Sequence, residues 1–369
     1  MSMCMNLLNN SNDTGTIFLL EGPCWGSLGL TLMLVLCYAL VLVLGLLGNI
    51  LLICIIARQQ DRRNVTSIFI ANLSVSDILI CVFCLPFTVS SMLMDRWVFG
   101  AVLCRLTPYI QCMSITVSVL SLVLIALERH QLVLHPSGWK PSPVHAYSAL
   151  LGVWLLAAVT AIPFLAFQVL SSTPYNELPP PLCQLQACHE EWPTPETRRA
   201  YSSALLVCQY FGPLLLILLC YLRIFLRLRL RRQLLERRHS RSRAEERRAV
   251  AHSKQVSIML VTLVTAFGVC WLPLNVFNAV ADWHEDALPI CQHDLLFSFC
   301  HILAMSSTCV NPIVYGFLNT NFRSEVRSTL LHCRCRPPEG DYHNFPLSVL
   351  PTHMSRTSLR TNCRNHSVC

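Results

Sequence analysis

Seven long stretches of this 369-residue chain are almost free of charge, and each is long enough to cross a lipid bilayer. A transmembrane helix needs about 20 consecutive, mainly apolar residues. Six runs without a charged residue exceed this length, and a seventh contains one charge, Asp77; the seven are Thr31–Ala57, Val65–Met94, Leu106–Leu127, Ala146–Asn176, Ala200–Leu222, Gln255–Ala281 and Leu295–Phe322. Only helices and closed barrels pair all their backbone groups in lipid. Continuous runs of this length therefore predict an all-α integral membrane protein, a seven-transmembrane helix bundle.

The distribution of Lys and Arg predicts the orientation of this bundle, because cytosolic loops carry an excess of these residues. The loops of one side hold Arg96, Arg198 and Arg199. The other side carries far more: Arg58, Arg62, Arg63, Lys140, twelve cations between Arg223 and Lys254, and seven from Arg323 onward. We therefore expect the N-terminus outside the cell and the C-terminus in the cytosol. The net charge of +8 does not predict nucleic-acid binding, because these cations flank spans and lie near lipid headgroups.

Four segments follow from this topology. We expect an extracellular tail over residues 1–30, the seven-transmembrane bundle over 31–318, an amphipathic membrane-surface helix over 319–332 and a cytosolic tail over 333–369. Apolar residues such as Phe322 and Val326 alternate with Arg323 and Arg327 in the third segment, a pattern typical of a helix lying on a membrane. The Arg-rich stretch Arg223–Arg248 predicts helix that extends two spans into the cytosol. No internal repeat is visible, which disfavours a secondary transporter, and no His-Glu-x-x-His string suggests a hydrolase.

The outer loops are acidic and carry two glycosylation sequons, at Asn9 and Asn12. An acidic rim raises the local concentration of a basic ligand, although it is also what an ordinary soluble surface contains. Its members are Asp13, Glu21, Asp95, Glu177, Glu190, Glu191, Glu196, Asp282, Glu285, Asp286 and Asp294. Most of the 20 cysteines lie inside spans, where Cys behaves as a small apolar residue.

Asp77 is the one carboxylate well inside a predicted span. A charge there costs several kcal/mol, so the side chain should face the interior of the bundle and have a partner. Polar residues at similar depth are Asn49, Ser118, Ser307 and Asn311. Such a group predicts either a small sodium site that includes Asp77 and Ser118, or a neutral Asp77 bonded to asparagine amides.

Three further features lie at span boundaries or kinks. Glu128 and Arg129 follow the third span, where Arg129 is either a lipid anchor or a latch directed toward the cytosolic mouth of the bundle. Pro273 and Pro312 each remove a helix hydrogen bond and predict hinges in spans six and seven. Trp271 lies just before the first of these prolines.

Together these strings resemble the rhodopsin-like G-protein-coupled receptors. The resemblance rests on Gly48-Asn49, Asn72–Asp77, Glu128-Arg129-His130, Trp154, Pro213, Phe267–Pro273 and Asn311-Pro312-Ile313-Val314-Tyr315. It implies that Asp77, Glu128, Arg129, Trp271, Pro273, Asn311, Pro312 and Tyr315 form the activation switch. His130 departs from the usual Tyr of the triplet, and Ser307 replaces an Asn of the sodium pocket. The resemblance also implies a disulfide from Cys104 to the second outer loop, where Cys183 and Cys188 are both available.

Longer strings are similar to the neuropeptide Y receptors. They are Trp97–Gly100, Tyr109–Ser114, Ala126–Gln131, Gly138-Trp139-Lys140-Pro141, Asp282-Trp283-His284 and Ser307–Pro312. In that pattern the loop cysteine precedes an acidic residue and Trp-Pro, as Cys188 precedes Glu190-Glu191-Trp192-Pro193. The resemblance therefore implies the pair Cys104–Cys188, and a second bridge between Cys24 and Cys291 is a further expectation.

The same resemblance implies the ligand, an amidated peptide ending in Arg-x-Arg-Tyr. Asp282, at the outer end of span six, suits a bidentate contact with a guanidinium, although it could also be an ordinary loop charge. Gln111 and Asn278 are expected to hydrogen-bond the arginine or terminal amide, with Thr88, His301, Phe277 and Phe297 around them.

The implied partners are a Gi/o protein, which lowers cyclic AMP, and arrestin in the cytosol, with the receptor in the plasma membrane. Cys333 and Cys335 are expected palmitoylation sites, with unmodified thiols as the alternative. Apart from the sodium ion, no cofactor is expected. The alternatives are another neuropeptide Y receptor subtype or related peptide receptor and, in a different class, a secondary transporter.

Overall fold

The computed structural model describes residues 28–58, 64–94, 96–172, 185–237, 243–283 and 290–318, with backbone alone at 28, 236–237, 243–245, 290–292 and 318. All of them belong to one compact unit, Met1–Arg327, and none to the second unit, Ser328–Cys369. The predictions for Asn9, Asn12, Cys24, Cys333, Cys335 and the surface helix lie outside the described residues, as does the side chain of Cys291.

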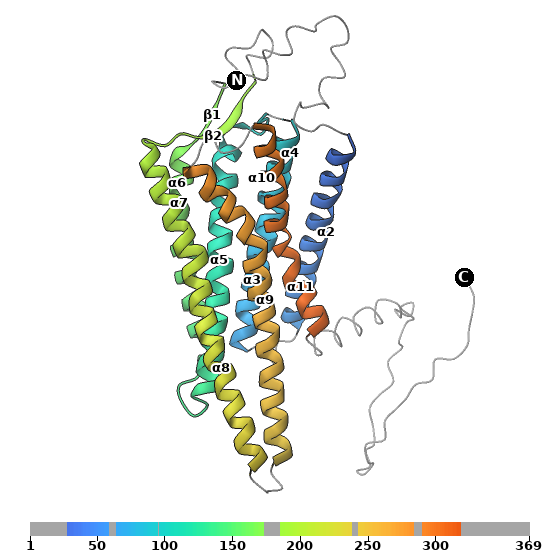
Figure 1. Cartoon of the computed structure of the whole chain (residues 1–369), viewed down its shortest axis with the longest axis vertical. Coiled ribbons are helices and arrows are strands. Elements are labelled where there is room, and N and C mark those ends of the chain that lie inside the picture. The colour runs from blue at the N-terminus through green and yellow to red at the C-terminus, as the bar shows by residue number, and fades with distance from the viewer. Residues whose placement is uncertain are drawn as a thin grey trace, which may run out of the picture. The chain divides into compact units, whose positions relative to one another are not determined.

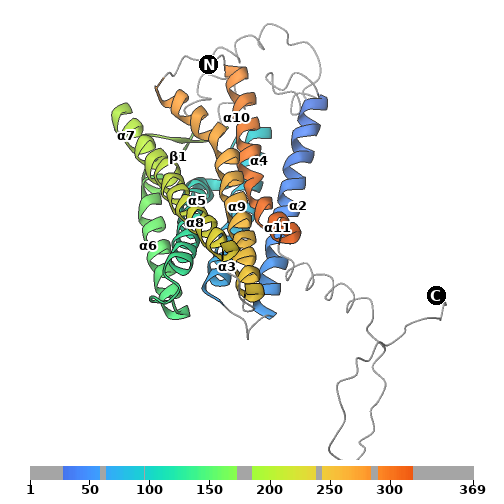
Figure 2. The same ribbon diagram turned by 60° about the horizontal axis from the view of Figure 1, so that its bottom comes forward.

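The predicted seven-helix bundle is confirmed, because seven helical segments are long and apolar enough to cross a membrane. They run alongside one another in both views of the chain (Figure 1, Figure 2). The described elements in order are α2 (Leu28–Arg58), α3 (Val65–Phe83), α4 (Leu85–Met94), α5 (Gly100–Leu134), α6 (Pro143–Phe167), β1 (Gln168–Ser171), β2 (Ala187–Glu190), α7 (Pro195–Leu205), the π-helical turn η5 (Leu206–Phe211), α8 (Gly212–Arg237), α9 (Arg243–Trp283), α10 (Ile290–Met305) and α11 (Ser307–Leu318).

Helices α8 and α9 confirm the predicted helical extension of the Arg-rich stretch, since both continue well into it. The uncharged run after Ala146 is helical only as far as Phe167, where the chain becomes strand β1. The uncharged run, which extends to Asn176, is therefore longer than the helix that crosses the membrane here.

Three spans are interrupted, and prolines explain two of the breaks. Pro86 follows the break at Cys84 between α3 and α4, and a proline ring fits the first turn of a new helix because its missing N–H is not needed there. Pro213 follows η5, the wider turn that precedes α8. The break between α10 and α11 falls at Ser306, six residues before Pro312, so the predicted hinge residue itself lies within a continuous helix.

A short antiparallel hairpin closes one end of the bundle, which we name the hairpin end (Figure 1). Strands β1 and β2 pair in the register Gln168 with Glu190 through Ser171 with Ala187. A disulfide joins Cys188 of β2 to Cys104 of α5, so the cysteine choice made from the sequence is confirmed. Arg105, which the count of loop cations omitted, donates from Nε to the carbonyl of Gln168 at 3.2 Å. These contacts fasten the hairpin to α5.

Polar side chains in the interior connect helices that are far apart in sequence. Trp154 of α6 donates to the amide oxygen of Asn72 at 2.9 Å, and the Asn72 amide nitrogen donates to Ser121 of α5 at 2.8 Å. Between lipid-embedded helices, such bonds and close packing replace much of the hydrophobic driving force.

Helices α2 and α11 approach very closely at Gly48. A methyl group added to Gly48 would lie 2.6 Å from Cγ of Pro312, closer than any real contact. One residue further on, Asn49 is buried and its amide nitrogen donates to the carbonyl of Thr308 at 2.8 Å. In a regular helix the N–H of residue 312 would donate to the carbonyl of Thr308, but proline has no N–H. Asn49 therefore supplies the missing donor.

We predict that Gly48→Ala destabilises the folded protein by roughly 1–3 kcal/mol, because the new methyl overpacks the α2–α11 contact. Thermal unfolding in detergent measures the loss. Gly152→Ala is the matched control, since nothing lies within 4 Å of the added methyl there. Equal melting temperatures for the two variants would contradict the close contact.

Candidate functional site

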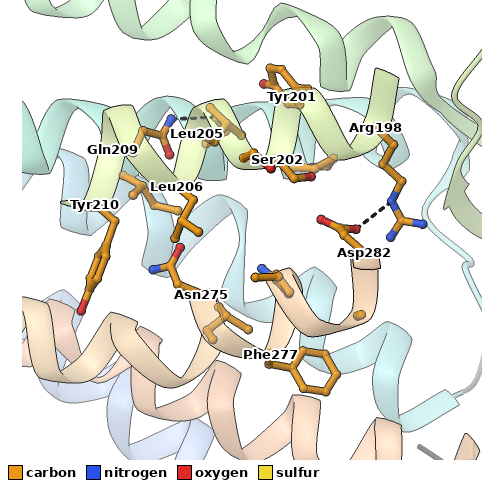
Figure 3. A pocket seen from close by; sticks show the side chains of 18 of the residues that line it. Arg198, Tyr201, Ser202, Leu205, Leu206, Gln209, Tyr210, Asn275, Phe277 and Asp282 are labelled. Carbon is orange, nitrogen blue, oxygen red and sulfur yellow. Dashed lines mark hydrogen bonds and ion pairs between the residues drawn. The ribbon is translucent and has the colours of Figure 1, made fainter. Parts of the chain in front are cut away.

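A cavity of about 490 Å³ lies at the hairpin end, between α5, α7, η5, α9 and α10. Figure 3 shows side chains from α7, η5 and α9 converging on it. Its wall is mixed, with aromatic rings, amides and ionic groups: Gln111, Phe164, Glu190, Trp192, Arg198, Tyr201, Gln209, Tyr210, Phe267, Trp271, Asn275, Phe277, Asn278, Asp282, Trp283, His293 and Phe297 are among its lining residues. An apolar cavity of this size with a few polar groups is typical of a ligand site.

Five of the seven predicted ligand residues line this cavity together: Gln111, Phe277, Asn278, Asp282 and Phe297. Thr88 and His301 are not among its lining residues. His301 is buried, with Nδ1 3.0 Å from the hydroxyl of Tyr38, and its ring stacks on Phe297 at a centroid distance of 5.6 Å. In this arrangement His301 lies behind Phe297 and positions its ring.

Asp282 is neither solvent-exposed nor free of partners. Its side chain is only 7% exposed, and Oδ1 lies 3.1 Å from Nε of Arg198 in the first turn of α7. The neighbouring Arg199 donates from Nε to the backbone carbonyl of Asp282 at 2.9 Å, and its guanidinium lies 5.8 Å from the ring centroid of Trp283. Sequence reasoning placed both arginines in an outer loop and gave them no role. The one available signal was their position at the start of span five, at the same membrane side as Asp282.

Aromatic rings hold the hairpin against this site. Trp192 lies between Phe167 and Tyr201, with ring centroids 4.5 and 5.2 Å away. The Tyr201 hydroxyl donates to the carbonyl of Thr160 at 2.6 Å, and the Trp192 indole donates to Glu190 at 2.7 Å. Offset and tilted ring pairs of this kind add to the free energy of burial. Glu190 is thereby held at the rim of the cavity.

Trp271 forms part of the cavity wall and connects it to α11. Its ring is buried, and the indole nitrogen donates to the hydroxyl of Ser307 at 3.1 Å. Ser307, predicted from the sequence as a companion of Asp77, therefore serves the tryptophan in this arrangement. A molecule in the cavity would therefore lie against the side chain of Trp271.

Below Trp271, Asp77 has a direct partner in span seven. Asn311 donates from its amide nitrogen to Asp77 Oδ2 at 2.6 Å, while Ser118 bonds to the hydroxyl of Ser76 at 2.8 Å. Asp77 and Ser118 therefore hydrogen-bond to Asn311 and Ser76, respectively, and not to each other. The described residues contain no group of three or more His, Cys, Asp or Glu side chains able to hold a metal ion. A carboxylate with hydroxyls is chemically suited to sodium, and the sodium site remains a prediction.

At the opposite end of the bundle, Arg129 is held by α3. The Thr66 hydroxyl donates to Glu128 Oε2 at 2.6 Å and accepts from Nη2 of Arg129, and Nε of Arg129 lies 3.6 Å from the same Glu128 oxygen. The Glu128 side chain is 6% exposed and that of Arg129 is 21% exposed. Tyr315 of α11 is also buried, and its hydroxyl has no hydrogen-bond partner within the described part of the chain.

The protein is a seven-helix membrane bundle with a cavity at one end. At the other end, Arg129 is held by hydrogen bonding and ion pairing. The family model described as "7 transmembrane receptor (rhodopsin family)" matches residues 48–315. The chain is thus a multi-pass membrane receptor and not an enzyme.

Similarity to individual proteins narrows the class. The chain is 43% identical to neuropeptide Y receptor type 4-2 of Homo sapiens, over 98% of this chain and 95% of that protein. It is 42% identical to neuropeptide Y receptor type 4 of Rattus norvegicus (97% and 95% covered) and 45% identical to neuropeptide Y receptor type 6 of Mus musculus (89% and 88% covered). The chain therefore belongs to the neuropeptide Y receptor family.

We predict that Thr66→Val raises agonist-independent nucleotide exchange on a co-expressed G protein about fivefold. In the arrangement that the structure shows, Arg129 donates a hydrogen bond to the Thr66 hydroxyl. Valine removes this bond, which is worth about 1 kcal/mol, and so destabilises that arrangement relative to one in which Arg129 is released. Thr262→Val is the control, because within the described part of the chain its exposed hydroxyl bonds to the carbonyl of Ile258 in its own helix. Basal exchange that matches the control would show that Thr66 does not restrain Arg129.

Proposed function

We propose that this protein is a plasma-membrane receptor for amidated peptides of the neuropeptide Y, peptide YY and pancreatic polypeptide family, with the N-terminus outside. The observation that carries the proposal is the buried carboxylate of Asp282 at the wall of a cavity rich in aromatic and amide groups. A guanidinium needs a carboxylate with bidentate geometry, and a neutral amidated tyrosine needs apolar walls with amide partners. The cavity contains both kinds of group.

The volume of the cavity limits which part of a peptide enters it. About 490 Å³ accommodates a few side chains and not a whole folded peptide. We infer that the C-terminal Arg-x-Arg-Tyr-amide enters the cavity, with Gln111 and Asn278 as amide partners and Phe277 and Phe297 as apolar walls. Glu190 and Glu191, which are more exposed, steer the basic peptide toward the opening.

Binding activates only if the ligand makes better contacts with one bundle arrangement than with another. We infer that the ligand displaces Trp271 and the Pro273 kink of α9, and that α9 then moves away from α5. This movement exposes Arg129 and an apolar groove that receives a helix of a Gi/o protein. Lower cyclic AMP follows, and arrestin binds the tail afterwards.

The sequence strings resemble those of the type 4 receptor, which prefers pancreatic polypeptide, and we propose the same preference for this protein. Competition of the three peptides for a labelled ligand on intact cells, with a cyclic AMP readout, separates this subtype from its sisters.

We predict that Asp282→Asn lowers the affinity for an Arg-x-Arg-Tyr-amide peptide roughly 10- to 150-fold, the effect of losing a charge-assisted hydrogen bond. The salt dependence of binding should fall as well, because one ionic contact is gone. Radioligand binding on surface-expressed receptor at two ionic strengths measures both effects.

Asp294→Asn is the matched control for this experiment, since Asp294 is half exposed and its side-chain hydrogen-bond partner among the described residues is the adjacent His293. Unchanged affinity in Asp282→Asn, or an equal loss in both variants, would remove Asp282 from the binding site.

A further inference from the structure

Arg198 occupies the position in which a ligand guanidinium would meet Asp282. Its Nε lies 3.1 Å from Asp282 Oδ1, and among the described side chains it is the only cation within 4.0 Å of that carboxylate. Figure 3 shows the two side chains pointing toward each other from α7 and α9, at the wall of the cavity. The site that suits an external arginine therefore already holds an internal one.

A carboxylate as buried as Asp282 requires such a partner in the absence of ligand. Burying a single charge without a counter-ion costs several kcal/mol, and removing one member of a buried pair exposes that cost. A ligand arginine that approaches Asp282 also meets the positive charge of Arg198. Two guanidiniums around one carboxylate repel each other, so the two cations compete for the same oxygens.

Arg198 also has an alternative position within reach. Its Nε lies 4.0 Å from Oε2 of Glu190 on the hairpin, and its side chain is 43% exposed, whereas that of Asp282 is 7% exposed. When a ligand cation takes Asp282, Arg198 can pair with Glu190 and with water. The exchange leaves neither arginine without a counter-ion.

We propose that Arg198 is an internal competitor of the ligand, which keeps Asp282 paired in the empty receptor and selects for ligands with a guanidinium able to displace it. The proposal rests on the proposed peptide-binding function and assigns Arg198 a role in specificity. The pair also joins the ends of α7 and α9, so ligand entry releases a contact between spans five and six.

Arg199 provides an internal comparison, since it lies next to Arg198 but uses other contacts. It bonds to the backbone carbonyl of Asp282 and lies over Trp283, and neither contact involves the carboxylate. Removing Arg199 takes away the same charge from the same turn of helix without freeing Asp282.

We predict that Arg198→Gln raises the affinity for a synthetic Arg-x-Arg-Tyr-amide peptide roughly two- to fivefold, the range expected when a half-exposed ion pair no longer competes. The same peptide with citrulline, a neutral isostere, in place of the arginine that meets Asp282 should gain nothing. Arg198→Gln should also have no effect in an Asp282→Asn background, and Arg199→Gln should not raise affinity in either. Saturation binding on intact cells, normalised to surface expression, measures these values.

The proposal is overturned if the wild-type receptor binds the arginine peptide and Arg198→Gln leaves its affinity unchanged or lowers it. Absence of any saturable binding to wild type would instead count against the peptide-receptor function.

A ligand-free measurement then tests the pair by itself: thermal unfolding of purified wild type, Arg198→Gln, Asp282→Asn and the double variant. Additive losses of melting temperature would rule out the Arg198–Asp282 pair. If Arg198→Gln does not reach the surface, Arg198→Lys, which keeps the charge but loses the planar fork, should still show a smaller gain in affinity, and no gain overturns the competition.

Discussion

The carbonyl of Thr308 has to be paired inside a membrane, and Pro312 has no N–H to offer it. Asn49 supplies the donor from α2 at 2.8 Å, and Gly48 beside it leaves room for the proline ring. One residue before the proline, Asn311 donates to Asp77 of α3. A single proline thus requires α2, α3 and α11 to meet at one depth. The buried carboxylate, which would otherwise be costly in this region, becomes part of the same contact.

These interior contacts continue toward the cavity. Ser307 precedes Thr308 by one residue and accepts the indole N–H of Trp271, whose ring belongs to the cavity wall. A displacement of Trp271 therefore acts on the same turn of α11 that Asn49 and Asp77 hold. Coupling between distant sites needs a packed and bonded structure with more than one stable arrangement. We propose that the proline-containing helices α9 and α11 are the movable parts, and that the polar contacts between them, such as the one from Trp271 to Ser307, define which positions are favourable.

The sequence contained the number, order and approximate ends of the spans, because length and absence of charge are directly visible in it. The sequence also indicated how deep in the membrane each residue lies, because its position within a span is visible. This was enough to group Asp77 with Asn311. Rotation of each helix about its axis was not readable, since the lipid-facing side of a span is as apolar as its inward side. His301 illustrates the difference: it has the depth of a ligand residue but faces Tyr38 behind Phe297. The hairpin strands and the Arg198–Asp282 pair join segments distant in sequence, and local patterns do not encode such pairings.

An acidic residue that must bind a cationic ligand is under two opposing requirements. A well-desolvated carboxylate binds a guanidinium strongly, because the local dielectric is low. The same desolvation makes the empty state costly. An exposed aspartate would avoid this cost and would bind weakly, since water and salt would screen it. An internal arginine reconciles the two, because it keeps the carboxylate buried and paired while its own exposed side chain, with Glu190 nearby, leaves at little cost. Under the proposed competition, the affinity depends on how much more strongly Asp282 binds the ligand guanidinium than that of Arg198, so ligands are distinguished by how well they replace Arg198.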